Sequence, residues 1–194
     1  MSYVQRRRFL WILFLGGLVL IAVVASATTL SRLNLDDLAQ ESTAVARLRC
    51  LGTRSLWDQG EIWTETKFEV LEREKGDLPG IVTVRLIGGR LGHLHSRVDE
   101  VPAFRAGEEV YLFLWGGAGE PYQVLGWSQG TFRIARIQRS GLEAVTQDSA
   151  SSPIFDPQTK SFRRGGIRNL PVAIFRERLH KALRAEKRAA AGEE

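Results

Sequence analysis

The chain has little cysteine and little histidine. Cys50 is the only cysteine, and three histidines occur among the 194 residues. A single cysteine excludes an internal disulfide, so the fold of this chain must depend on hydrophobic burial. Cys50 lies within residues 45–51, a run typical of a β-strand, and we interpret it as a buried small hydrophobe. A reactive thiol or an intermolecular disulfide is the alternative.

Sequence motifs of catalysis are also missing. The chain has no G-x-S-x-G nucleophile elbow, and the glycines of residues 88–92 are not followed by the helix and Lys-Ser/Thr of a phosphate loop. His93 and His95 could point to one side of an extended segment, but zinc needs three or four ligands and His180 is distant in the sequence. We therefore expect no cofactor and no metal, and a protein that is not an enzyme. A metal-dependent enzyme that uses His93 and His95 is the alternative.

An excess of positive charge is confined to the two ends of the chain. The net charge of the chain is +5, but residues 1–27 contribute three arginines and no acid to it. Residues 28–150 hold 14 Lys/Arg against 17 Asp/Glu, and residues 151–194 hold 10 against 5. An acidic body thus carries a basic tail, and the small remaining net charge gives no indication of nucleic-acid binding.

A long hydrophobic run is present at the N-terminus, over residues 9–25. Three arginines precede this run, and the small residues Ala25-Ser26-Ala27 end it. This order is that of an export signal, so we predict a signal peptide over residues 1–27 and a periplasmic or secreted protein. If it is not cleaved, the run would be a short anchor in the cytoplasmic membrane, which is the alternative. Residues 6–10 also resemble the twin-arginine pattern, although the very apolar run fits the general secretory route better.

Beyond residue 43, hydrophobic residues alternate with polar ones, which is the period of a β-strand. Strands are predicted at residues 45–53, 62–71, 81–87, 109–115, 122–127 and 131–137, with a weaker strand at 142–146. Short strands joined by glycine-rich turns are typical of small barrels. The sequence therefore predicts a mainly β fold, a small antiparallel OB-like barrel of about six strands, over residues 28–146.

Helices are predicted on both sides of the strands. Asn34 precedes Leu35-Asp36-Asp37-Leu38 and has the character of an N-cap, which indicates a short N-terminal helix. Residues 147–170 have the composition of a loop or linker. Residues 171–190 form a basic amphipathic pattern, and we expect this C-terminal helix to dock its apolar stripe on the barrel and to fray from about Ala185.

A binding surface is predicted near the longest irregular segment, residues 88–107. We expect Trp57, Trp63, His93, His95 and Arg97 to contribute to it, because aromatic side chains near loop tips stack on sugars or anchor proteins. The tryptophans could instead cap the ends of the barrel. The expected partner is another envelope or secreted protein, or a polysaccharide. No nucleic acid is expected, and membrane contact is expected only through an uncleaved N-terminal segment.

A series of short motifs extends from Leu35 to Ile134 in this chain. They are Leu35-Asp36-Asp37-Leu38, Trp57-Asp58-x-Gly60, Thr64-x-Thr66-x-Phe68-Glu69-Val70, Lys75-Gly76-Asp77, Gly88-Gly89, residues 104–114, and Gly126-x-x-x-Gly130-x-Phe132. In these motifs the chain resembles an uncharacterised family of exported bacterial β-barrel proteins. The resemblance implies export and a β-barrel fold, and it implies no particular activity.

The Lys75-Gly76 pair after a predicted hairpin is a feature of a more remote likeness. Here the chain resembles the OB-like domain of the netrin module and of the tissue inhibitors of metalloproteinases. The resemblance implies, as an alternative function, an inhibitor or companion of an exported metalloprotease. Those inhibitors bind the protease zinc through an N-terminal cysteine, whereas this chain would begin at Thr28 after cleavage, so their mechanism does not carry over.

Overall fold

The structure is a computed structural model that describes residues 31–117, 119–137 and 141–191. The predicted signal peptide, residues 1–27, lies outside the described residues. The elements in chain order are α2 (Leu35–Glu41), β1 (Ala44–Asp58), β2 (Glu61–Lys75), β3 (Ile81–Ile87), β4 (Gly89–Leu91), β5 (Leu94–Ser96), β6 (Glu109–Trp115), β7 (Gln123–Val124), the 3₁₀ helix η1 (Trp127–Gly130), β8 (Thr131–Arg136), β9 (Glu143–Gln147), the 3₁₀ helix η2 (Asp148–Ser151), β10 (Ile154–Asp156), β11 (Ser161–Arg163), β12 (Leu170–Pro171) and α3 (Val172–Ala191).

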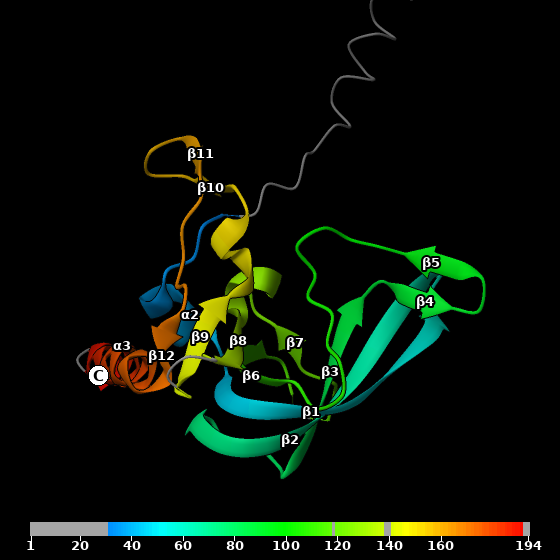
Figure 1. Cartoon of the computed structure of the whole chain (residues 1–194), viewed down its shortest axis with the longest axis horizontal. Helices are drawn as coiled ribbons and strands as arrows, with labels where there is room; N and C mark the ends of the chain where they lie inside the picture. The colour runs from blue at the N-terminus through cyan, green and yellow to red at the C-terminus, as the bar shows by residue number, and fades with distance from the viewer. Residues whose placement is uncertain (1–30, 118, 138–140, 192–194) are drawn as a thin grey trace, which may run out of the picture. The chain divides into compact units, whose positions relative to one another are not determined.

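The fold is mainly β, with a short N-terminal and a longer C-terminal helix, as predicted. One antiparallel sheet has the strand order β12-β9-β8-β6-β1-β2-β3, with β7 paired to β6 (Figure 1). Two small hairpins, β4–β5 and β10–β11, stand outside this sheet. The β1–β2 hairpin is its longest unit, with 15 residues in each strand.

Part of the sheet curls into a ring. The backbone of Tyr122, just before β7, accepts a hydrogen bond from Arg85 N at 2.8 Å and donates one to the Thr83 carbonyl at 2.9 Å. This parallel bridge joins β3 to β7, so β1, β2, β3, β7 and β6 surround one core. That core contains the buried side chains of Leu48, Phe68 and Leu112 and of eleven other residues, among them Cys50 and Phe104. The interpretation of Cys50 as a buried hydrophobe is therefore confirmed.

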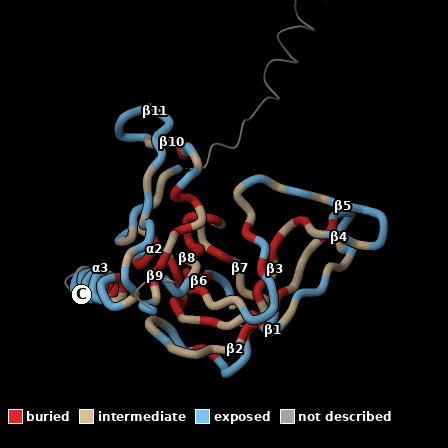
Figure 2. Tube along the Cα trace, in the orientation of Figure 1, coloured by how far each residue is buried: buried red, intermediate tan, exposed pale blue. Residues whose placement is uncertain are grey.

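A second core lies on the other face of β1 and β6. Val45 of β1 and Tyr111 and Phe113 of β6 pack there against α2, α3, β8 and β9. Figure 2 shows buried stretches along β6 and β8, while the far end of the β1–β2 hairpin is half-buried or exposed apart from Ile62. Because β6 is buried on both faces, its residues 110–114 are all apolar or aromatic rather than alternating.

Both helices form and pack on the sheet as predicted, but α3 begins at Val172 rather than Pro171, because Leu170 and Pro171 pair with β9 as β12. The Asn34 side chain accepts hydrogen bonds from the backbone N–H groups of Asp36 and Asp37, and the Asp37 carboxylate accepts one from Asn34 N. This capping box satisfies donors that a helix start leaves unpaired. The apolar stripe of α3 is buried through Phe175 and Leu179. The helix continues to Ala191, so the predicted fraying from Ala185 does not occur in the described chain. Neither described helix contains a stretch long and apolar enough to cross a membrane.

Three details differ from the sequence predictions. The described sheet is not one closed six-stranded barrel: β8, β9 and β12 lie outside the ring. The strand expected at residues 122–127 is only Gln123–Val124, because Gly126 adopts a left-handed conformation (φ 60°) and begins η1. Residues 147–170 are more than a linker, since they contain η2 and the β10–β11 hairpin.

Candidate binding cavity

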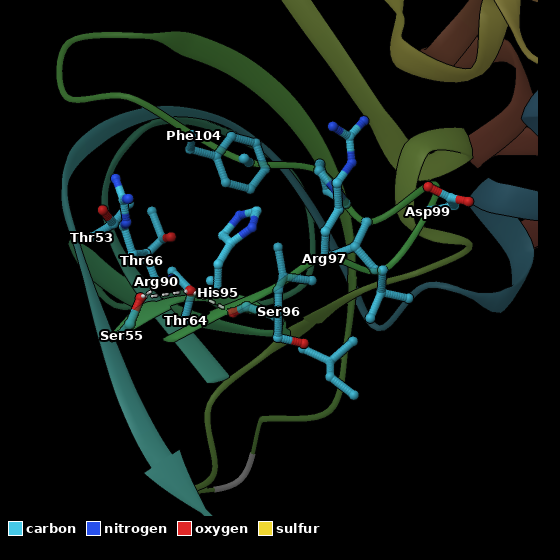
Figure 3. Close-up of a pocket in the computed structure, with 18 of the residues that line it drawn as sticks. Thr53, Ser55, Thr64, Thr66, Arg90, His95, Ser96, Arg97, Asp99 and Phe104 are labelled. Carbon is cyan, nitrogen blue, oxygen red and sulfur yellow. Dashed lines mark hydrogen bonds between the residues drawn. The ribbon is translucent and has the colours of Figure 1, made fainter. Parts of the chain in front are cut away.

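A cavity of about 710 Å³ lies where the β1–β2 hairpin extends beyond the packed ring core (Figure 3). Residues 88–104 form its cover: they leave β3, make the β4–β5 hairpin and return as irregular chain to Phe104. The predicted irregular segment thus contains a short hairpin and encloses a site. Its size is within the range of about 300–1,000 Å³ found for ligand pockets.

Hydroxyl groups form one wall of this cavity. In the hairpin register Thr53 lies opposite Thr66, and Ser55 lies opposite Thr64. All four line the cavity, because alternate residues of β1 and β2 point to the inner side of the ring. The Ser55 and Thr64 hydroxyl oxygens are 3.2 Å apart, and Thr64 donates to the Gly88 carbonyl at 2.7 Å. The inner face of the hairpin therefore changes from apolar at Phe68 to hydroxylated nearer its tip.

Gly89 lets the cover approach this hydroxyl wall. A Cβ atom at this position would lie 2.2 Å from the Thr64 hydroxyl oxygen and 2.7 Å from that of Ser55. Its φ of 134° is also one that other residues rarely adopt. The next residue, Arg90, donates its backbone N–H to the Ser55 hydroxyl at 3.3 Å. The start of the cover is thus held directly against the hairpin.

Basic side chains stand at the rim. Arg90 and His95 lie opposite each other in the β4–β5 hairpin, and Arg97 follows β5. All three are exposed and line the cavity. In Figure 3 the His95 ring points into the space between the hairpin hydroxyls and Phe104. Within the described residues neither arginine forms an ion pair, so their charges are available to a ligand.

The far end of the cover is anchored at two points. The Phe104 ring packs edge-on against Phe68 in the ring core, with centroids 5.0 Å apart. The Ser128 hydroxyl donates to the Glu100 carboxylate, and Ser128 N donates to the Glu100 carbonyl at 2.9 Å. Asp99 is exposed at this end, on the other side of the cavity from Arg90 (Figure 3). Asp99 is thus separated from Arg90, whereas Arg97 lies on the same side of the cavity as Asp99.

The two predicted tryptophans do not join this site. Trp57 is 56% exposed near the hairpin tip. Trp63 pairs with Leu56 in the hairpin register, so it projects from the opposite face to Trp57. The guanidinium of Arg85 covers the Trp63 ring at 4.7 Å, and Arg85 also forms an ion pair with Asp58. Neither tryptophan lines the cavity.

Of the predicted loop residues, His95 and Arg97 line the cavity and His93 does not. His93 is exposed in the turn between β4 and β5. Sequence reasoning missed the hydroxyl wall. Its signal was present in Thr64 and Thr66, which put polar side chains into the inward register between the buried Ile62 and Phe68.

Metal ligands do not assemble around His93 and His95. In the described chain, no group of three or more His, Cys, Asp and Glu side chains could hold a metal ion. His180 lies on α3, where its Nε2 is 2.6 Å from a Glu74 carboxylate oxygen. Burial raises the pKa of the Cys50 thiol, so little of it is the reactive thiolate.

Comparisons of the chain with protein-family models, with curated proteins and with solved structures give no match.

Proposed function

We propose that this protein is a non-enzymatic binding module exported to the cell envelope, and that its cavity binds an acidic oligosaccharide segment of an envelope or extracellular polysaccharide. The observation that carries the proposal is the pairing of a hydroxyl wall with two unpaired arginines across one cavity. Export rests on the order of charged, apolar and small residues at the N-terminus.

The chemistry of the lining favours a sugar that bears carboxylates. The hydroxyls of Thr53 and Ser55 can each donate and accept hydrogen bonds, as the hydroxyls of a sugar require. Arg90 and Arg97 present planar guanidinium groups, which bind carboxylates through two parallel hydrogen bonds. Phe104 adds an apolar surface at the inner end. A ligand that is both hydroxylated and anionic satisfies all of these groups together.

Calorimetric titration with a galacturonic acid tetramer and with the neutral maltotetraose tests this proposal. We expect the acidic tetramer to bind and the neutral one to bind much more weakly. Arg90→Gln and Arg97→Gln should each lower the affinity for the acidic tetramer by about tenfold, because each removes a charge-assisted hydrogen bond. Arg136→Gln is the matched control, since Arg136 is an exposed arginine on β8 outside the cavity.

A second variant separates hydroxyl recognition from simple charge attraction. Thr53→Val keeps the shape of an exposed side chain and removes only its hydroxyl. It should weaken binding of the tetramer severalfold without changing the salt dependence of the affinity. Equal affinity for the acidic and the neutral tetramer, or an equal loss in the Arg136→Gln control, would contradict the proposal.

A further inference from the structure

The β10–β11 hairpin projects from the rest of the described chain beyond η2 (Figure 1). We propose that this hairpin is a contact surface for an anionic phospholipid bilayer. The proposal is independent of the cavity, which lies on other elements.

An aromatic pair gives the hairpin an apolar face. Phe155 of β10 lies directly opposite Phe162 of β11, with their ring centroids 5.5 Å apart. Phe162 is 66% exposed, more than any other large hydrophobic residue among those described. Its ring is free to insert at the boundary between the headgroups and the acyl chains, where aromatic residues are favoured.

Exposed cations lie on both sides of the hairpin, with Arg163 opposite Ile154 on the face away from the aromatic pair. Lys160, Arg163 and Arg164 are exposed, and the only acid of the hairpin is Asp156. The Asp156 carboxylate accepts hydrogen bonds from the backbone N–H groups of Gln158 and Thr159, and these bonds stabilise the turn between the two strands. An exposed aromatic residue beside three cations is complementary to an anionic lipid surface.

The start of the described chain is fixed to this same hairpin. Ser31 forms a parallel bridge with Phe155, and Arg32 N donates to the Phe155 carbonyl at 3.0 Å. The Gln129 side chain adds a clamp: it accepts from Leu33 N at 2.8 Å and donates to the Ser31 carbonyl at 2.9 Å. The position of Ser31 relative to the hairpin is therefore set by backbone and side-chain bonds.

Ser31, which is fixed to the hairpin, lies close in sequence to the N-terminal hydrophobic run, residues 9–25. That run ends at Ala25, six residues before Ser31. Few residues therefore separate the run from the part of the chain that the structure describes. If the chain is instead cut after Ala27, the new amino group at Thr28 adds one positive charge to the remaining chain.

Vesicle sedimentation with residues 28–194 tests the proposal. This fragment contains the compact unit of residues 31–194 with both cores, and it lacks the hydrophobic run that would bind any membrane. We expect it to bind vesicles of phosphatidylcholine with phosphatidylglycerol, to bind pure phosphatidylcholine vesicles weakly, and to be released at high salt.

Variants assign this binding to the hairpin. The triple substitution Lys160→Gln, Arg163→Gln and Arg164→Gln should lower the affinity for anionic vesicles on the order of a hundredfold. Phe162→Ala should lower it severalfold and leave the salt dependence unchanged. The matched control replaces three exposed cations of α3, Lys181→Gln, Arg184→Gln and Lys187→Gln.

Two results would overturn the proposal. One is a fragment that binds anionic and neutral vesicles equally weakly. The other is a loss of binding in the α3 control that equals the loss in the hairpin variant. Circular dichroism of each variant checks that the fold is kept. The hairpin variant and the α3 control each lose three positive charges, so their net charges are equal.

Discussion

Gly89 is the residue at which the cover of the cavity passes closest to the hairpin. The space beside its Cα is occupied by the hydroxyl oxygens of Thr64 and Ser55. These two side chains also hold Gly88 and Arg90 through hydrogen bonds. A side chain at position 89 would therefore separate the cover from the wall that it is bonded to.

We predict that Gly89→Ala destabilises the fold by about 2 kcal/mol or more, from the close contact and the unfavourable φ together. Ligand binding in the cavity should weaken as well. Gly60→Ala is the control, because Gly60 also has a positive φ (86°) but has no atom near the position of an added Cβ. It should cost about 1 kcal/mol. Chemical denaturation measures both, and equal losses would show that the hydroxyl wall does not constrain residue 89.

At the scale of elements, α3 is held to the sheet by packing and by ion pairs. The Phe175 ring lies 5.0 Å from that of Tyr111 and 5.1 Å from that of Phe132. At the edge of this contact, Arg176 is 3.0 Å from Glu72 of β2. Tyr111 is fully buried, and this burial raises its pKa to about 12.

We predict that Phe175→Ala destabilises the protein by about 3–5 kcal/mol, because it leaves a cavity beside the rings of Tyr111 and Phe132. Ile174→Ala is the neighbouring control, since Ile174 is 42% exposed and its loss should cost well under half as much. Thermal unfolding followed by circular dichroism distinguishes the two. Similar losses would mean that α3 docks through another face.

Elements with a clear period were predictable from the sequence. The stripe of Phe175 and Leu179 has helical spacing, and the alternation in β2 and β3 marks their inner faces. The β10–β11 hairpin was not predictable, because its strands have three residues each and pair locally around Asp156. Such short strands carry no measurable period.

The candidate site was predictable only in part, for a physical reason. His95 and Arg97 were found because they lie in a long segment between strands. Trp57 and Trp63 are close in sequence, but their faces depend on the register of the hairpin, and the register depends on bulges such as that near Gly52. A shift of one residue changes the face of every side chain beyond it.

At the scale of the whole molecule, a network of charges joins four strands. Arg47 of β1 contacts Glu109 of β6 at 2.5 Å, Glu143 of β9 at 3.0 Å and Glu72 of β2 at 3.5 Å. Arg49 binds the second carboxylate oxygen of Glu109 at 2.9 Å. Burial acts to raise the pKa of Glu109, but the hydrogen bonds and charges of Arg49 and Arg47 outweigh it, so this pKa lies below its ordinary value.

This lowered pKa predicts how stability depends on pH. The ionised Glu109 stabilises the fold fully above the pKa of an unfolded glutamate, about 4.3, and the contribution is lost as the pH falls through the lower folded pKa. We expect Glu109→Gln to cost about 2 kcal/mol at neutral pH. The difference from the unsubstituted protein should shrink in acid.

Urea denaturation at neutral pH and in acid measures this difference. Glu65→Gln serves as the control, because its partner Arg54 is exposed and such pairs contribute at most about 1 kcal/mol. A Glu109→Gln variant whose deficit is the same at both pH values would show that the carboxylate charge does not matter.

Strands β1 and β6 lie between the two cores, and this limits how the chain can be truncated. One face of each strand packs in the core of the ring, and the other face packs in the core that contains the helices. Truncation after β6 would leave Tyr111 and Phe113 facing water, and truncation before it would open the ring. A cut next to β6 therefore leaves neither piece with a complete core, and a split-protein pair made there should be insoluble unless both parts are expressed together.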